Sequence, residues 1–320
     1  MKKIILTGFL VFLGGALVAQ NIQIQKDTVV VARDGTGDFR SLQEVFDQIR
    51  GYRPTPSVVL IKKGVYKEKL VLHSWLEDVT LIGEDRDQTI ITWDDHARIN
   101  NMGTYRTYTL LVQGNRITFE NLTIENNAAQ MGQAVAVHVE GDRVIFRNCR
   151  LLGNQDTLFA TGRENTRHYF ENCYIEGTTD FIFGQSISWF EGCTIHCKRN
   201  SYISAASTPQ NQQYGYIFNR CKITLAEGVN RVYLGRPWRA YSMTLFMNCE
   251  LPQGILPEGW QNWNNTEHNK TARYMEYNNT GEGASTAQRV EWVKILTPQE
   301  AEKFTVANVM KGYDGWNPQK

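Results

Sequence analysis

Short apolar runs alternate with polar turns along most of this chain, and few segments repeat hydrophobic positions at the helical period of about 3.6 residues. A recurring unit consists of a β-rich run that ends in phenylalanine, two further residues, a cysteine, another apolar run and a polar turn. The five clearest copies have their phenylalanines at positions 146, 170, 190, 218 and 246. Their cysteines are separated by 24, 20, 28 and 28 residues, and an earlier copy has Phe119 with Leu122 in the cysteine position. Periods in this range predict a solenoid of stacked strands, for which a right-handed parallel β-helix is the natural candidate.

Two capping patterns predict the few helices. Ser41 stands three residues before a glutamate and predicts a helix to about Ile49, which could close one end of the solenoid. Thr297 has the same spacing with proline at the first helical position, so a second short helix to about Phe304 is expected. The segment 261–283 is rich in asparagine and glycine and is expected to be a loop.

Five of the six cysteines share one repeat position, so stacked coils would align them in a column. Free cysteine packs as a compact hydrophobe, and a buried ladder explains the pattern without disulfides, although the spacing of neighbouring coils would not forbid a bridge. Cys197 lies outside this register. Asparagines at 121, 148, 172 and 248 predict a second column, in which side-chain amides bond backbone groups of adjacent coils.

Two carboxylates also share a register. Asp156 and Asp180 each stand seven residues after a cysteine of the column, so they should lie one strand spacing apart, about 4.8 Å at the backbone. Two carboxyl groups that close cannot both ionise cheaply, which is how a site obtains an acid and a nucleophile together. The alternative is a pair of solvated turn aspartates. Spacing alone does not decide between the two readings.

The first residues change the expected location of the protein. Lys2 and Lys3 precede an apolar run over 4–19, which predicts a cleaved signal peptide over 1–20. We therefore expect an exported protein, periplasmic or secreted, with no membrane span in its mature form and one solenoid domain over 21–320. Loss of both lysines leaves 32 basic against 33 acidic residues, a net charge of −1. With no basic stripe, nucleic acid is not an expected partner.

Seven sequence blocks carry a family resemblance. They are GVYKE at 64–68, QAVA at 133–136, GNQDTL at 153–158, DFIFG at 180–184, LGRPW at 234–238, PEGW at 257–260 and YNNTG at 277–281. Over roughly residues 28–316 the chain resembles the pectin methylesterases, also called pectinesterases. The order of the blocks makes a chance match improbable. The resemblance implies a parallel β-helix that hydrolyses the C6 methyl ester of galacturonate units in pectin.

Carried over position by position, the resemblance implies catalytic roles for five residues. Asp180 would be the nucleophile and Asp156 the general acid and base. Gln133 and Gln155 would donate to the oxyanion, and Arg236 would pair with the nucleophile. Residue chemistry agrees, since a guanidinium beside one carboxylate should keep its pKa low while the proton stays on the other. No metal or other cofactor is implied.

Substrate contacts are expected from a second group. The resemblance places Trp238 in the sugar-binding wall and aligns Thr104 with a substrate-contacting threonine, and Gln133 and Arg236 should also touch the substrate. Phe181 is expected in the groove because apolar sugar faces stack on aromatic rings, and Phe183 is expected to point the same way. The expected partner is methyl-esterified homogalacturonan, bound by a monomer.

Three other functions fit parts of the pattern. A polygalacturonase-like glycoside hydrolase also needs two nearby carboxyl groups, but its transition state is positive at the anomeric carbon and leaves two amide donors without a purpose. A calcium-dependent pectate lyase needs a cluster of acidic ligands, whereas this region supplies two in register. A non-catalytic carbohydrate-binding solenoid would leave the stacked acids unexplained. The esterase is the favoured reading.

Overall fold

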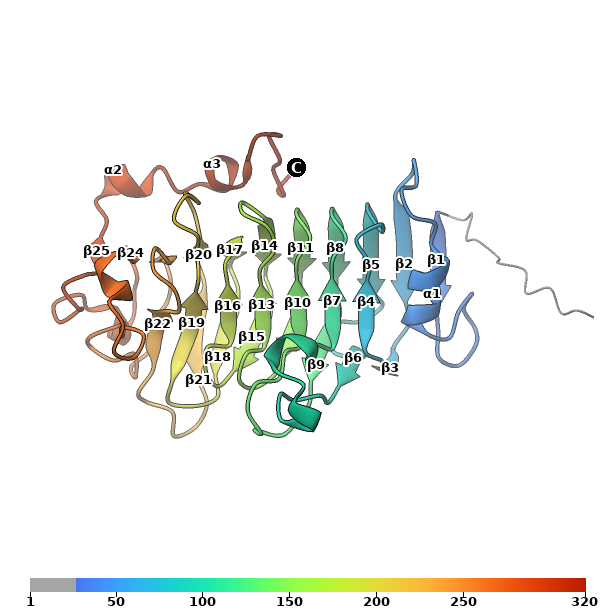
Figure 1. Cartoon of the computed structure of the whole chain (residues 1–320), viewed down its shortest axis with the longest axis horizontal. Coiled ribbons are helices and arrows are strands. Elements are labelled where there is room, and N and C mark those ends of the chain that lie inside the picture. Colours follow the sequence, from blue (N-terminus) through green and yellow to red (C-terminus); the bar gives the residue numbers. More distant parts are fainter. Residues whose placement is uncertain (1–26) are drawn as a thin grey trace, which may run out of the picture.

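Figure 1 shows the computed structural model, which describes residues 27–320, as a stack of coils built from three parallel sheets. Each coil contributes one strand to each sheet through most of the stack, and every strand pairs with its equivalent on the next coil. The expectation of a parallel β-helix is confirmed. The longest sheet, called the long sheet here, runs in the order β1 (Thr28–Val31), β2 (Ser57–Ile61), β5 (Val79–Gly83), β8 (Ile117–Glu120), β11 (Val144–Arg147), β14 (Arg167–Glu171), β17 (Ile187–Glu191), β20 (Tyr216–Asn219), β23 (Met243–Met247), β24 (Arg273–Tyr277) and β25 (Lys294–Ile295).

Two shorter sheets complete each coil. The second sheet contains β4 (Leu70–Leu72), β7 (Leu110–Val112), β10 (Val137–Val139), β13 (Leu158–Ala160), β16 (Ile182–Gly184), β19 (Tyr202–Ala206) and β22 (Tyr233–Pro237). The third contains β3 (Gly64–Lys67), β6 (Thr89–Trp93), β9 (Thr123–Asn126), β12 (Arg150–Leu152), β15 (Tyr174–Gly177), β18 (Thr194–Cys197) and β21 (Lys222–Leu225).

Helical segments are short. They are α1 (Leu42–Gln48), α2 (Pro298–Ala301), α3 (Val306–Met310) and the 3₁₀ turns η1 (Ile99–Asn101), η2 (Thr104–Arg106), η3 (His268–Lys270) and η4 (Glu282–Ala284). Both capping predictions are confirmed: the Ser41 hydroxyl accepts from the backbone N–H of Glu44, and Thr297 forms the full capping box. The second helix ends at Ala301, earlier than expected. The loop expected over 261–283 is wrong in part, because β24 lies within it.

The repeated residues fill the interior. The phenylalanine rings at 119, 146, 170, 190, 218 and 246 stack coil upon coil with centroids 4.2 to 5.1 Å apart. The five cysteines of the repeat are buried and free, as expected, and Cys197 is buried and free on β18. The asparagine column differs from expectation. Asn148 donates to the side-chain oxygen of Asn121 at 2.7 Å, so these amides bond one another as well as fixing left-handed turns.

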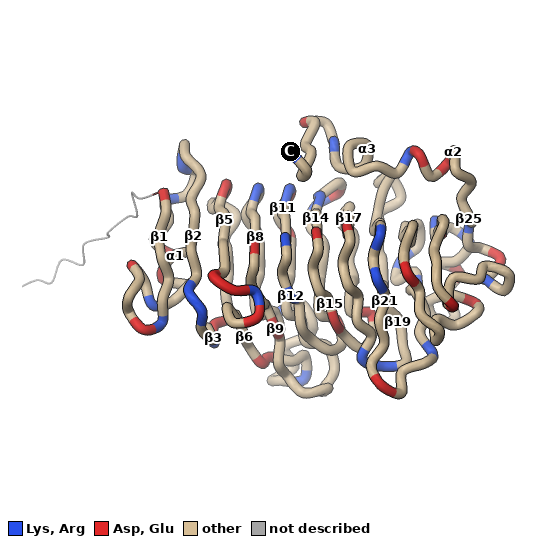
Figure 2. The backbone as a smooth tube through the Cα atoms, turned by 180° about the vertical axis from the view of Figure 1, so that it is seen from behind, with Lys and Arg blue, Asp and Glu red and all other residues tan. Residues whose placement is uncertain are grey.

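Charged residues of both signs are interspersed over the outer surface (Figure 2). On the long sheet, for example, Arg147 lies between Glu120 and Glu171, with nitrogen to oxygen distances of 3.4 and 3.1 Å. Across residues 27–320, no helix is long and apolar enough to cross a membrane. The expected signal peptide over 1–20 lies outside the described residues.

The segment after α2 crosses the coil ends of the long sheet (Figure 1) and is fastened by one buried arginine. Arg167, with its side chain only 3% exposed, bonds both oxygens of Asp314 and both of Asp142. It also donates to the carbonyl of Met310 at 3.0 Å. The residues 306–320, called the C-terminal strap here, are therefore tied to the β-helix through an ion pair.

Acid should release this strap. Arg167 lowers the pKa of Asp314 to about 2 from an ordinary 3.8. Because the folded pKa is the lower one, the pair stabilises the fold fully above about pH 4 and loses that effect as the pH falls towards 2. Protection factors for amide hydrogen exchange across 306–320, which correct for the slower intrinsic exchange in acid, should fall over this range. Asp314→Asn should show faster exchange at neutral pH, and unchanged protection there would contradict the proposed fastening.

Candidate active site

Strand register brings the two aspartates together. Leu158 of β13 lies opposite Ile182 of β16, and Asp156 and Asp180 each stand two residues before these partners. The backbone N–H of Asp156 donates to the carbonyl of Thr179 at 3.2 Å, which continues the same pairing into the turn. Both aspartates have left-handed backbones, with φ of 67° and 48°. Aspartate tolerates this region better than most residues, and non-glycine residues held there cluster at functional sites.

The burial of the two aspartates decides between the two interpretations of the pair, an acid with a nucleophile or two solvated turn residues. Asp156 is 8% exposed and Asp180 is 5% exposed. Solvated turn aspartates would be open to water, so that alternative is wrong. A buried carboxylate needs a partner or a proton, and the two aspartates meet this need differently.

Asp180 has a charged partner. Arg236 on β22 donates from Nε to Oδ1 at 3.0 Å and from a terminal nitrogen to Oδ2 at 2.6 Å. This two-point contact fixes the orientation of the carboxylate and is the stronger form of an arginine ion pair. The structure thus brings Arg236 to the aspartate with which it was expected to pair.

The pKa values of the two carboxyl groups are shifted unequally. Burial raises the pKa of Asp180 above its ordinary value, and Arg236 only partly opposes this. The expectation that the arginine would keep this pKa low is therefore wrong, because desolvation outweighs the ion pair. The pKa of Asp156 is raised well above its ordinary value, first by burial and next by the charge of Asp180. Of the two carboxyl groups, Asp156 is therefore the one whose protonated form is favoured more strongly.

The two glutamines stack next to the acid pair. Gln133 and Gln155 form an isolated parallel bridge between neighbouring coils, and the carbonyl of Gln155 accepts from the N–H of Ala134 at 3.0 Å. Both side chains are half-buried. Gln155 directly precedes Asp156, and its side chain lowers the pKa of the Asp156 carboxyl group without offsetting the effect of burial. One glutamine is thus adjacent to Asp156 in the chain, and the other lies opposite the first on the neighbouring coil.

Aromatic side chains form a wall along the second sheet. The rings of Phe159 and Phe183 stack at 4.4 Å, and Trp238 meets Phe183 edge-on at 5.9 Å. Trp238 therefore belongs to this aromatic wall. Tyr105 of η2 stacks on Phe159 at 5.2 Å and is half exposed. Thr104, half-buried at the start of η2, is placed beside this wall by its neighbour.

Phe181 does not belong to the wall. Its side chain is 0% exposed and packs in the main core, so the expected groove contact is wrong. Phe183 faces outward instead, and the two rings do not point the same way. The left-handed backbone at Asp180 turns the chain just before β16, so Phe181 and Ile182 both enter the core before strand alternation starts.

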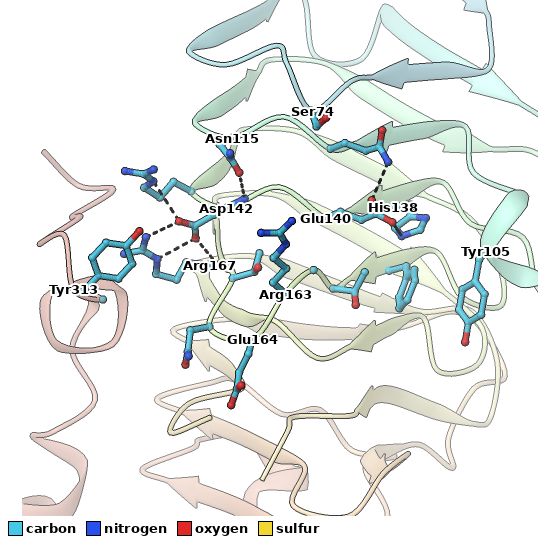
Figure 3. A pocket seen from close by; sticks show the side chains of 18 residues that line it. Ser74, Tyr105, Asn115, His138, Glu140, Asp142, Arg163, Glu164, Arg167 and Tyr313 are labelled. Atoms are coloured by element: carbon cyan, nitrogen blue, oxygen red, sulfur yellow. Dashed lines mark hydrogen bonds and ion pairs between the residues drawn. The ribbon is translucent and has the colours of Figure 1, made fainter. Parts of the chain in front are cut away.

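A cleft of about 1000 Å³ continues from the wall across the second sheet (Figure 3). Tyr105 and Phe159 line it where it meets the wall. Farther along, His138 contacts Glu140 at 3.2 Å, and Arg163 stands at the rim. The aspartate pair is not part of this lining. The cleft therefore continues the surface of the aromatic wall and does not include the aspartate pair.

The sequence reasoning missed two residues at the arginine. The ring of Tyr202 and the ring of Trp263 each lie 4.0 Å from the guanidinium carbon of Arg236. Strand register could have found Tyr202, because β19 pairs with β16 and brings it to the coil beside Asp180. Trp263 lies in an irregular segment, where the repeat pattern carries no information.

Comparisons with known proteins identify the family of this chain. The family model described as Pectinesterase matches residues 28–313. Pectinesterase 31 of Arabidopsis thaliana is 35% identical over 287 residues, covering 86% of this chain and 90% of that protein. Probable pectinesterase/pectinesterase inhibitor 23 of the same plant is 35% identical over 309 residues, covering 92% of this chain.

Coverage differs between these relatives. The chain spans about half the length of several curated relatives that it matches, 54% in the case of the pectinesterase/pectinesterase inhibitor 23. The solved pectin methylesterase from carrot superposes with a TM-score of 0.85 at 32% identity, covering 91% of this chain and 95% of the carrot chain. The match in sequence and in fold shows that this chain belongs to the pectinesterase family.

Proposed function

We propose that this protein hydrolyses the C6 methyl ester of galacturonate units in methyl-esterified homogalacturonan, releasing methanol and leaving the polysaccharide backbone intact. The observation that carries the proposal is a buried aspartate pair in which Asp180 is bound at two points by a guanidinium, with two glutamines paired on neighbouring coils, one of them next to Asp156 in the chain. Family membership supports the same substrate class. Pectin lies outside cells, in keeping with the expected export; we propose that the mature protein acts there as a monomer.

In the first half of the reaction, the ionised Asp180 carboxylate attacks the ester carbonyl carbon. Negative charge then develops on the carbonyl oxygen, where the side-chain amides of Gln133 and Gln155 can donate hydrogen bonds. Arg236 keeps the attacking carboxylate oriented. Asp156, which carries the proton of the pair, gives that proton to the departing methoxide as the carbon–oxygen bond breaks. Methanol leaves, and an acyl anhydride with Asp180 remains.

In the second half, water replaces methanol. Asp156, now ionised, takes a proton from the water as its oxygen attacks the acyl carbon. Cleavage of the bond to Asp180 frees the galacturonate carboxylic acid and restores the nucleophile. Asp156 is protonated again, so the pair returns to its starting charge. No redox partner or metal enters these steps.

The stacked glutamines favour this reaction over glycoside cleavage. An unequal carboxyl pair would suit either chemistry. Glycosidic bond cleavage develops positive charge at the anomeric carbon, and amide N–H donors would not stabilise it. Ester hydrolysis develops negative charge on oxygen, for which such donors are suited.

Product identity tests the proposal. Methylated pectin incubated with the full-length chain, processed or unprocessed, should yield methanol without new reducing ends and without unsaturated sugars. New reducing ends would establish a hydrolase of the backbone, and unsaturated products a lyase. Binding of pectin with no product in any assay would leave a carbohydrate-binding protein.

Each glutamine should contribute to kcat more than to KM. Removing one oxyanion donor typically lowers the rate about 10²- to 10³-fold, so Gln133→Ala and Gln155→Ala should each lower kcat by that order with a small change in KM. Methanol release at saturating pectin measures the effect. Gln319→Ala is the matched control, because that amide bonds only the Tyr169 hydroxyl on the far side of the fold. A large rise in KM with normal kcat would assign the glutamines to ground-state binding.

A further inference from the structure

The guanidinium of Arg236 is enclosed between two aromatic rings. Tyr202 lies 4.0 Å from its central carbon on one side, and Trp263 lies 4.0 Å from it as well. Its N–H groups meanwhile bond both oxygens of Asp180. The side chain of Arg236 is 15% exposed. The aromatic rings and the carboxylate together leave this cation little contact with water.

Tyr202 is held rigidly in this position. Its carbonyl accepts from the backbone N–H of Asp180 at 2.9 Å, so the residue that flanks the arginine also fixes the turn that presents the nucleophile. Its ring stacks on Tyr233 of the next coil at 5.3 Å, and its hydroxyl donates to the side chain of Gln261.

Trp263 is held by its own segment. Gln261, two residues earlier, bonds the carbonyl of Gly235 through its N–H at 3.2 Å, which ties the start of the segment to β22 beside Arg236. Thr266 closes a turn on the Trp263 carbonyl with its hydroxyl at 2.6 Å and its N–H at 3.1 Å. An irregular segment thus delivers one indole ring to the arginine from outside the β-helix.

We propose that Tyr202 and Trp263 are positioning residues that hold the guanidinium of Arg236 edge-on against Asp180 and thereby keep the nucleophile ionised. This inference rests on the proposed esterase function. Rings on the faces of a guanidinium attract its charge while leaving the N–H edge free for a carboxylate. They also exclude water, so the attraction between arginine and aspartate acts through a lower dielectric.

Such help is needed because Asp180 is buried. Burial opposes ionisation of its carboxyl group, and Arg236 is the group that counteracts burial. An arginine free to tilt or to bind water would counteract it less. The rings therefore act on the reaction through Arg236, without touching the reacting atoms.

Other charged or titratable groups near this pair are few among the described residues. Asp156 faces Asp180 from the preceding coil, and the charges of Asp180 and Arg236 act in opposite directions on the pKa of the buried Tyr274 of β24. His268 of η3 bonds the carbonyl of Pro237, next to the arginine, at 3.0 Å. Arg239 stacks on Trp238 at 4.5 Å. None of these residues is altered in the test that follows, so a change in the pH profile reports on the rings.

The test compares Trp263→Leu with Trp263→Phe and Tyr202→Phe. Methanol release from methylated pectin gives kcat and KM across a pH series, and thermal unfolding checks that each variant folds. Trp263→Leu should lower kcat about tenfold, the order expected from one partly desolvated ring over a cation. The acid limb of the pH–rate profile of this variant should move to higher pH by roughly half a unit to one unit, because Asp180 is then harder to ionise. Trp263→Phe and Tyr202→Phe both keep an aromatic ring beside the guanidinium. They should therefore retain most of the kcat of the unaltered protein and the same acid limb of the pH–rate profile.

A different pattern would overturn the inference. Trp263 also packs against the aromatic wall. If it served only to bind sugar, Trp263→Leu would raise KM and leave kcat and the acid limb unchanged, as expected for Trp238→Leu. If Trp263→Leu did not fold, Tyr202→Leu would be measured instead, and the same changes in kcat, KM and the acid limb would support or overturn the inference. Absence of methanol release by the unaltered protein would refute the proposed function itself, a result distinct from either pattern.

Discussion

Asp180→Asn should abolish methanol release, with kcat lowered by roughly 10⁴- to 10⁶-fold, the range seen when a covalent nucleophile is removed. The amide keeps the shape of the side chain but has no negative charge with which to attack the ester carbon. Arg236 would then face a neutral partner, so the two-point ion pair observed at 3.0 and 2.6 Å would also be lost. Binding of pectin should persist, since the aromatic wall is untouched.

The control for Asp180→Asn must remove a buried ion pair without touching the site. Asp142→Asn does so, because Asp142 bonds the buried Arg167 at 2.6 Å, at the end of the cleft away from Tyr105 in Figure 3. We expect Asp142→Asn to lower stability while leaving kcat near that of the unaltered protein. Substantial methanol release by Asp180→Asn, with its fold intact, would instead require another nucleophile, and Asp156 would be the first candidate.

The repeat made much of the fold and the acid pair predictable. Each coil has to present a flat ring and a small apolar group at the same interior positions, so the phenylalanine and cysteine columns recur visibly in the sequence. Asp156 and Asp180 keep a fixed distance from those columns, and their side-by-side placement follows from parallel register. The glutamines needed the family resemblance as well, because an isolated amide is equally suited to a structural ladder.

Residues set by local geometry could not be predicted in the same way. The sequence spacing of Phe181 and Phe183 is the same whether their rings point into the core or out of it. The left-handed turn at Asp180 decides that the Phe181 ring enters the core. The pKa of Asp180 depends on the balance between its burial, which raises the pKa, and its ion pair with Arg236, which lowers it. The extent of burial cannot be read from the sequence alone. Trp263 reaches the site from an irregular segment, so the repeat pattern of the sequence does not predict its position.

Asp156→Asn should lower kcat by about 10²- to 10⁴-fold, the usual contribution of a general acid and base. Methoxide is a poor leaving group without a proton, and asparagine can neither supply one nor later activate water. The variant should fold well. Since the folded pKa of Asp156 is raised, its ionisation destabilises the fold as the pH rises from the ordinary value of 3.8 towards the folded pKa. Removing the ionisable group should leave stability at neutral pH equal or higher, by thermal unfolding.

The pH profile gives the sharper result for Asp156. In the unaltered protein, kcat/KM should rise as Asp180 ionises and fall as Asp156 loses its proton, and both limbs should lie above the ordinary aspartate range because both pKa values are raised. In Asp156→Asn the residual rate should keep the acid limb and lose the alkaline one, since no proton remains to be lost at that position. Persistence of the alkaline limb in the variant would assign it to another group and remove Asp156 from the role of proton donor to methoxide.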